Sequence, residues 1–181
     1  PLHPTITDST FPLSPPHFFI LLFSLFFFSS RSRHTIFRNV TGVQTCALPI
    51  YPKLLINEAQ VYVTDSAYKI CMKTGFDLSS FIYSFYNTLT IVCSELFGRY
   101  YGGGVLELIP SEFKRLPIPY VAINEKIFQQ FYNRAKKAAN ITEILQENDN
   151  YILKDNLKLT EEQIIRLQKI RTQLYNKRLK L

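Results

Sequence analysis

The 181-residue chain is basic, with 21 lysines and arginines against 14 acidic residues and a formal net charge of +7. All three histidines precede residue 51, so residues 51–181 lack the commonest general base and metal ligand. Hydrolytic triads and histidine-bearing metal centres are therefore excluded there. Residues 51–181 contain two cysteines, Cys71 and Cys93, whose spacing is not that of a metal site. We expect no zinc site, no disulfide framework and a reducing, cytoplasmic setting.

Composition changes abruptly near residue 50. Six of the ten prolines lie before Tyr51, whereas all eleven tyrosines lie at or after it. Residues 1–50 contain three arginines, no lysine and a single acidic residue, while residues 51–181 contain 18 cationic and 13 acidic residues. Two parts this different rarely share one core.

The segment Val40–Ile50, VTGVQTCALPI, resembles a sequencing-library adapter translated in frame. The preceding FFILLFSLFFFSSRSRHTIF is what a pyrimidine-rich stretch of DNA would encode. We therefore predict that residues 1–50 are a chimeric segment without a genuine fold, and expect poorly packed helix or coil. Phe18–Phe28 is shorter than the roughly 20 residues of a spanning helix, so we predict no membrane association. The alternative, a small membrane protein anchored there, depends wholly on this segment.

The first elements after residue 50 are predicted from alternation and helical periodicity. Ala59–Lys73 mixes β-branched and aromatic residues with polar ones, which predicts one or two strands around a turn at Asp65-Ser66. From Leu78 to Leu96 apolar residues recur in steps of three and four, which predicts one amphipathic helix. Asp77 is a plausible N-cap, and Gly98 is placed to end the helix in a left-handed conformation.

A glycine-rich turn follows this helix. Three consecutive glycines, Gly102–Gly104, are usual where the backbone turns tightly or approaches another group closely, although a flexible hairpin connection explains them equally well. Val105–Ile109 is predicted to be a short strand stopped by Pro110. Ser111–Leu116 is predicted to form a single helical turn, which Pro117 and Pro119 return to extended chain.

The C-terminal part is predicted to be helical. Helices are expected at about 124–139 and 142–147, with a loop over 148–155. A last helix begins at Thr160, where TEEQ makes a capping box, and continues to the end. Its cations predict a basic surface that is either a solvated face or a nucleic-acid contact: Arg166, Lys169, Arg171, Lys177, Arg178 and Lys180.

Together these elements predict an α+β fold that is mainly helical with a few short strands. We divide the interpretable part into an α+β region, residues 51–123, and a helical region, residues 124–181.

Several segments in order resemble one enzyme family. VYVTDSAYKI, SSFIYSFYNTLTIVCSELFGR, YYGGGVLELIPSEFKRLPIPY and LTEEQIIRLQKIRTQLYNKRL look like the C-terminal, target-recognition part of adenine-specific DNA methyltransferases of restriction–modification type. The resemblance covers essentially all of residues 51–181. It implies a bacterial, cytoplasmic enzyme that transfers a methyl group from S-adenosylmethionine to a flipped adenine.

The catalytic signature of this family, Asn/Asp-Pro-Pro-Tyr/Phe, is absent from the chain, and PIPY at Pro117–Tyr120 does not match it. No glycine motif lies between a strand and a helix as the cofactor requires. We therefore expect no catalytic residue, no cofactor in this fragment and no methyl transfer by it alone. The resemblance implies three partners: double-stranded DNA, an N-terminal catalytic domain, and a restriction or specificity subunit.

DNA engagement is the role left to the fragment. The candidate DNA-binding residues lie in and after the glycine-rich turn: Arg99, Tyr100, Tyr101, Gly102, Gly103, Gly104, Lys114 and Arg115. Lysine and arginine would bind phosphates, while tyrosine would stack on an exposed base or bind a phosphate. For each residue an exposed or packing side chain is the alternative. The alternative for the whole fragment is a non-enzymatic module whose basic terminal helix packs on a partner subunit.

Overall fold

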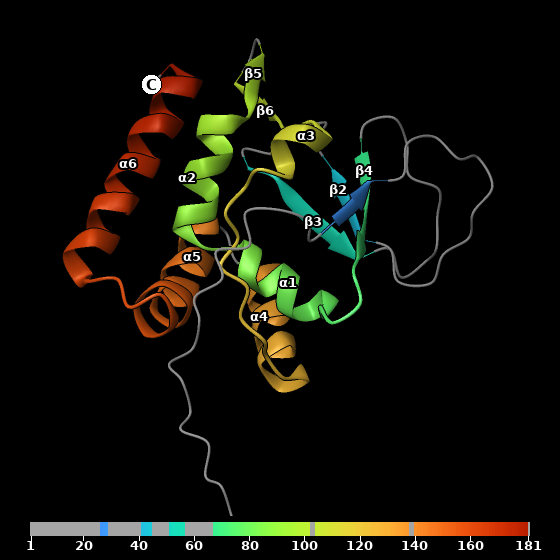
Figure 1. Cartoon of the computed structure of the whole chain (residues 1–181). Helices are drawn as coiled ribbons and strands as arrows, with labels where there is room; N and C mark the ends of the chain where they lie inside the picture. Colours follow the sequence, from blue (N-terminus) through green and yellow to red (C-terminus); the bar gives the residue numbers. More distant parts are fainter. Residues whose placement is uncertain are drawn as a thin grey trace, which may run out of the picture.

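The computed structural model describes residues 26–28, 41–44, 51–56, 67–101, 104–137 and 140–180. The strands in these residues are β1 (Phe26–Phe28), β2 (Thr41–Gln44), β3 (Lys53–Ile56), β4 (Ala67–Met72), β5 (Arg99–Tyr101) and β6 (Val105–Glu107). The helices are α1 (Leu78–Phe85), α2 (Thr88–Phe97), α3 (Pro110–Phe113), α4 (Glu125–Lys137), α5 (Ile141–Asp149), a π-helical segment η1 (Asn150–Asn156) and α6 (Glu161–Leu179). The fold is α+β with helices predominating, which confirms the predicted class (Figure 1).

Four strands form one antiparallel sheet in the order β1-β4-β2-β3, and β5 and β6 form a separate hairpin. In β4, Ile70 pairs with Phe28 on one side and Thr41 on the other, and its side chain is fully buried. β4 confirms the C-terminal half of the strand region predicted at Ala59–Lys73. The predicted turn at Asp65-Ser66 lies outside the described residues, and β3 was not predicted.

Two strands lie within residues 1–50, where we expected helix or coil. That expectation is wrong for β1 and β2, because both pair with β4 and β2 also pairs with β3. Strand pairing uses backbone groups that every non-proline residue carries, and the β-branched Thr41 and Val43 suit a pleated strand. Strand geometry therefore does not test the origin of this segment, and its assignment to adapter DNA stays a prediction.

The single helix predicted from Leu78 to Leu96 is two helices broken at Tyr86-Asn87. Asn87 is fully buried and its side-chain oxygen accepts a bond from the Thr90 backbone N–H at 2.9 Å, which caps α2. Its amide nitrogen donates to the Ser84 carbonyl at 2.7 Å. Side-chain capping by asparagine competes with helix continuation, and here it overrides the apolar periodicity. The predicted cap of α1 is confirmed, since Asp77 accepts from the Ser80 N–H at 2.7 Å.

The proline-containing segment after α3 is held against α1 by two serines. Val121 N–H donates to Ser84 Oγ at 2.9 Å, and Ile123 N–H donates to Ser80 Oγ at 3.0 Å. Four helical residues rise about 6 Å, which matches the rise of two extended residues, so one helix face can bind alternate residues of the extended chain. As predicted, the helical turn ends before Pro117, and residues 116–124 have no helix or strand assigned.

One buried cluster joins the sheet to all the principal helices. It includes Phe81 and Phe85 of α1, Phe113 of α3 and Phe131 of α4, each nearly or fully inaccessible to solvent. A fully buried side chain of this size contributes roughly 1.5–3 kcal/mol of hydrophobic stabilisation. The aromatic residues of α1 are therefore core residues.

The C-terminal region differs from prediction in one element and one surface. Residues 148–155 are not a loop: α5 continues to Asp149 and passes into η1, where Ile152 and Leu153 are fully buried. The predicted capping box of α6 is confirmed, with Thr160 and Gln163 exchanging bonds at 2.9 and 3.3 Å. The predicted basic surface is wrong for Arg171 and Arg178, which are both buried. Arg178 pairs with Glu95 of α2, along which α6 packs (Figure 1), and Arg171 donates to Thr142 of α5.

Candidate nucleic-acid interface

The β5–β6 hairpin projects from the end of α2 and carries the first three candidate residues (Figure 1). Tyr100 and Tyr101 are 60% and 55% exposed. Tyr100 pairs with Leu106, whose own side chain is 1% exposed, so the hairpin is anchored through β6 while β5 faces solvent. Gly104 closes the turn with φ +75°, a conformation that favours glycine. Gly102 and Gly103 lie outside the described residues.

Gly98 sets the point where α2 ends and β5 begins. It is the C-cap of α2, but its φ of −76° is not left-handed, so that prediction is wrong. Glycine is required there for a different reason. A Cβ atom at this position would lie 2.7 Å from the Ser94 carbonyl oxygen and 2.8 Å from Leu106 Cδ1. The close approach of helix end and hairpin, and not a positive φ, explains the glycine.

An ion pair links the hairpin to α3. Arg99 Nε donates to Glu112 Oε1 at 2.6 Å, and this bond raises the pKa of the Arg99 guanidinium. The other oxygen of Glu112 accepts from the Ile109 N–H at 3.1 Å, which caps α3. The Arg99 side chain remains 56% exposed. It can therefore reach a phosphate while its position stays fixed by α3.

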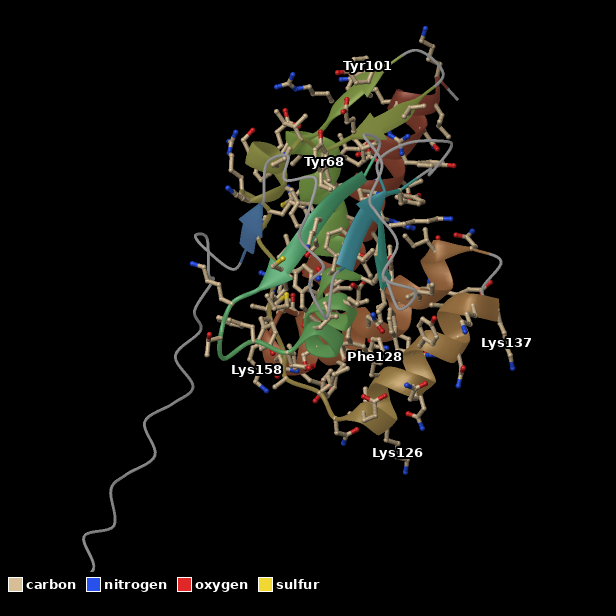
Figure 2. All side chains as sticks on the ribbon, turned by 90° about the vertical axis from the view of Figure 1, so that its right-hand side faces the viewer. Tyr68, Tyr101, Lys126, Phe128, Lys137 and Lys158 are labelled. Atoms are coloured by element: carbon tan, nitrogen blue, oxygen red, sulfur yellow. The ribbon has the colours of Figure 1, made fainter. Side chains whose placement is uncertain are left out.

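The last two candidates follow α3 directly. Lys114 is the C-cap residue of α3, and both it and Arg115 are exposed. The Arg115 guanidinium carbon lies 5.0 Å from the centre of the Phe97 ring, at the end of α2. The structure thus places the described candidates around one end of the molecule. Figure 2 shows Tyr101 at this end, with Lys126 and Lys137 of α4 at the opposite end.

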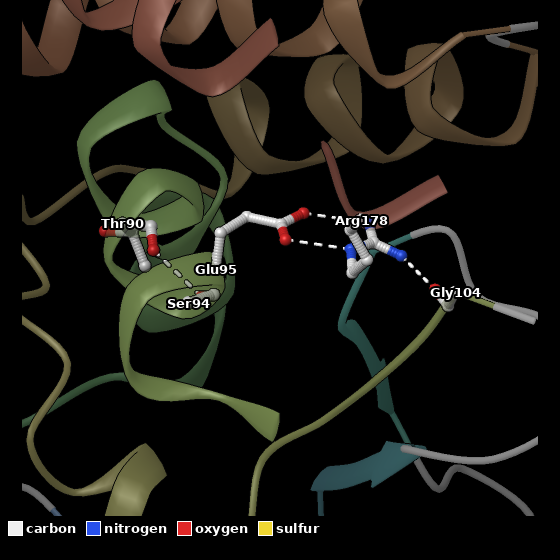
Figure 3. Close-up of polar contacts among 5 residues, drawn as sticks. All are labelled: Thr90, Ser94, Glu95, Gly104 and Arg178. Atoms are coloured by element: carbon white, nitrogen blue, oxygen red, sulfur yellow. Dashed lines mark hydrogen bonds and ion pairs between the residues drawn. The ribbon is translucent and has the colours of Figure 1, made fainter. Parts of the chain in front are cut away.

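A buried ion pair that the sequence did not reveal contacts the turn of the hairpin. Arg178 of α6 donates from Nε and Nη2 to the two oxygens of Glu95 in α2, both at 2.8 Å (Figure 3). Its Nη1 donates to the Gly104 carbonyl. The side chains of Arg178 and Glu95 are 1% and 3% exposed. We call these three residues the Arg178 brace.

The buried carboxyl group of Asp149 serves the fold. Asp149 accepts from the backbone N–H and the hydroxyl of Thr88, at 2.7 and 2.6 Å, at the N-terminal end of α2, and burial raises the pKa of its carboxyl group. A carboxylate at this helix end also complements the helix dipole. Burial raises the pKa of the Cys93 thiol, which keeps it protonated and unreactive.

Metal binding and membrane insertion find no support in the part of the chain that the structure describes. Those residues contain no cluster of three or more histidine, cysteine or acidic side chains arranged to hold a metal ion. Among their helices, none has the length and apolar character needed to cross a membrane.

Comparison with protein families decides the relationship of the chain. Residues 42–153, more than half of the chain, match the model of a family described as Type II methyltransferase M.Eco57I, C-terminal domain. The chain belongs to this family. Searches of curated proteins and of solved structures found no match. The predicted resemblance to the C-terminal part of restriction–modification methyltransferases is therefore confirmed.

The boundaries of the match to the M.Eco57I C-terminal family are informative. Every candidate residue of the hairpin and of α3 falls inside it, whereas α6, which supplies Arg178, falls outside. The match begins at Gly42, within the adapter-like segment Val40–Ile50. The predicted division of the chain at residue 50 stays a prediction.

Proposed function

We propose that the chain is a DNA-binding, target-recognition part of an adenine-specific DNA methyltransferase that acts in the bacterial cytoplasm. A separate domain would bind S-adenosylmethionine and carry the catalytic signature. Membership of the M.Eco57I C-terminal family supports the methyltransferase assignment. The adenine target and the contact with double-stranded DNA are our inference from the residues, and we expect no methyl transfer by the chain alone.

The observation that carries the proposal is the exposed tyrosine pair on an anchored hairpin. The two tyrosines are consecutive in β5, so their side chains project to opposite faces of the hairpin, where each is exposed and suits stacking on a base or packing in a groove. Tyr100 and Tyr101 lie between an ion pair to α3 and the Arg178 brace, so neither needs a large rearrangement to make a contact. This rigidity reduces the entropy that binding would cost.

The cations around the hairpin fit a phosphate-binding role. Arg99, Lys114 and Arg115 are exposed and lie on β5 and just after α3, which the Arg99–Glu112 pair joins. Lysine and arginine contacts to phosphate release counterions, so the affinity they provide falls as salt increases. In this arrangement the cations position the protein on the duplex, and the tyrosines contact bases or sugars.

The test measures duplex DNA binding by the full chain with fluorescence anisotropy over a range of salt concentrations. Replacing Lys114 and Arg115 with alanine should weaken binding and reduce the slope of log K against log salt by about one for each phosphate that the variant no longer neutralises. The matched control replaces Lys126 and Lys137, exposed lysines on α4 at the opposite end, and should leave the slope nearly unchanged. Both double variants remove two positive charges.

A third double variant tests the tyrosines. Replacing Tyr100 and Tyr101 with alanine should weaken binding by about 1–3 kcal/mol per stacked base, with little change in the salt slope. Equal weakening by the α4 control would contradict a localised interface, as would affinity that is absent at low salt or insensitive to salt.

The alternative, a module whose terminal helix packs on a partner subunit, has less support. One face of α6 already packs on α2 within this chain, with Ile164 buried and Arg178 paired to Glu95. The cations left on its exposed side are Arg166, Lys169, Lys177 and Lys180. DNA binding that these four cations alone controlled would favour α6 over the hairpin as the contact surface.

A further inference from the structure

A pocket of about 850 Å³ lies on another part of the molecule, between β3, α4 and α6. None of the hairpin candidates is among the described residues that line it. Its volume is within the roughly 300–1,000 Å³ of typical small-molecule sites. The pocket is therefore large enough for a ligand and separate from the proposed DNA contact.

The charges around this pocket are of one sign. Its charged lining residues are Lys53, Lys136 and Arg171, and none of the described lining residues is acidic. Lys53 and Lys136 are exposed, whereas Arg171 is only 7% exposed. A concave surface with this charge favours an anion.

Arg171 is the charged residue of the pocket whose hydrogen-bond donors lack acceptors. Its Nη2 donates to Thr142 Oγ1 at 3.1 Å, but Nε and Nη1 are buried and have no acceptor among the described residues. Asp149, whose charge interacts with Arg171, already accepts bonds from Thr88 and Gln168. A buried guanidinium with unmet donors is costly unless an anion completes its hydrogen bonds. Phosphate has the acceptors to do so.

Aromatic rings line the rest of the pocket. Tyr51 and Tyr175 stack with ring centres 5.4 Å apart, and Tyr175 lies one helical turn after Arg171. Lys136 Nζ lies 4.3 Å from the centre of the Tyr132 ring. The Tyr175 ring also has the Arg178 guanidinium carbon 5.5 Å from its centre, and the Tyr132 ring stacks on Phe128. A planar ring would therefore pack on the face of Tyr51 turned away from Tyr175, while amide groups, such as that of Asn176, bind its edge.

We propose that this pocket binds a nucleoside monophosphate, with its phosphate on Arg171 and its ring against the tyrosines. Both parts of the ligand are needed. The guanidinium donors and the absence of carboxylates among the described lining residues select the phosphate, and the stacked tyrosines select the ring. This inference does not depend on DNA binding by the hairpin.

Calorimetric titration of the full chain with adenosine monophosphate, adenosine and inorganic phosphate tests this proposal. Adenosine monophosphate should bind at least about tenfold more tightly than either of the others, because a charge-assisted phosphate contact and ring packing add. Arg171→Met should weaken adenosine monophosphate binding by about tenfold or more and leave adenosine binding nearly unchanged. Lys169→Met, an equal change of charge at an exposed position of α6, should have no effect.

A second variant covers the case in which Arg171→Met disturbs folding. Lys136→Met alters an exposed residue of the pocket, and should weaken the nucleotide by about threefold without changing the thermal unfolding midpoint. The proposal is overturned if inorganic phosphate binds as tightly as the nucleotide, if adenosine does, or if none of the three binds at millimolar concentration. Equal weakening by Lys169→Met would overturn it as well.

Discussion

Two arginines on α6 are equally buried but differ in their hydrogen-bond acceptors. This difference, and not burial, separates an arginine that stabilises the fold from one that we propose binds a ligand. Arg171 and Arg178 are about two turns apart on the same face of α6, and they are 7% and 5% exposed. Arg178 has both oxygens of Glu95 and the Gly104 carbonyl as acceptors. Arg171 has Thr142 alone among the described residues and lines a pocket.

The difference predicts opposite responses to mutation. A buried ion pair with every donor satisfied contributes little beyond what apolar residues of equal volume would, but removing one partner leaves a buried charge unpaired. A buried cation that already lacks partners has much less to lose. We therefore expect changes around Arg178 to affect folding, and changes around Arg171 to affect ligand binding.

The largest effect should follow from Glu95→Gln. It leaves the Arg178 guanidinium buried without its carboxylate, and should lower the free energy of unfolding by about 3–5 kcal/mol. Urea denaturation measures this, with the exposed Glu162→Gln of α6 as a control that should change stability by less than about 0.5 kcal/mol. The double variant Glu95→Gln/Arg178→Met should regain much of the loss. If Glu95→Gln lowers the free energy of unfolding by less than about 1 kcal/mol, the ion pair in the Arg178 brace does not stabilise the fold in this way.

Neither arginine could be assigned from the sequence, and the reason is distance along the chain. Glu95 and Arg178 are separated by 83 positions, and the periodicity of α6 indicates only which face is buried. The spacing of Ile164, Leu167 and Leu174 allows either Ile170 or Arg171 on the apolar stripe of this helix, and both arginines were also predicted to belong to its basic surface. Partners supplied by other elements of the fold decide such cases.

Features with local causes were predicted well. The caps at Asp77 and Thr160 depend on contacts three residues away and are confirmed. The break at Asn87 also has a local cause, but the apolar spacing on both sides concealed it. For the DNA-binding candidates, the structure adds the Arg99–Glu112 pair, which places the hairpin beside α3.

The next largest effect should come from the glycine in the brace. Gly104→Ala should lower stability by roughly 1–2 kcal/mol for the positive φ, and by a further amount because the new Cβ would lie 2.5 Å from Leu179 Cδ2. Gly75→Ala is the matched control, since Gly75 also has a positive φ but has no atom within 4 Å of the added Cβ. Thermal unfolding of the two variants separates backbone strain from contact with α6. Equal losses would mean that the Leu179 side chain moves aside, so that contact with α6 adds no cost to the backbone strain.

Arg171→Met should change the free energy of unfolding by less than about 1 kcal/mol, because it removes one hydrogen bond together with a buried charge whose other donors are unmet. Urea denaturation in the absence of nucleotide is the measurement. Its comparison with Glu95→Gln is the most direct test of the contrast between the two arginines. A loss of about 3 kcal/mol or more would indicate that Arg171 has a structural partner, and would remove the main reason to expect an anion in the pocket.

The smallest effect concerns Asp149, the carboxylate whose charge interacts with Arg171. Burial raises the pKa of Asp149, so the folded state binds its proton more tightly than the unfolded state does. The contribution of this group to stability is then complete below the unfolded pKa and declines as pH rises through the folded pKa. In urea denaturation from about pH 3.5 to 7, the original protein should lose stability relative to Asp149→Asn as pH increases, while the exposed Asp155→Asn should show no such divergence. If the original protein instead gains stability relative to Asp149→Asn, the carboxylate is favourably paired when ionised. The hydrogen bonds from Thr88 would be the first explanation and the charge of Arg171 a lesser one, and repeating the comparison in an Arg171→Met background would show whether Arg171 has Asp149 as a partner.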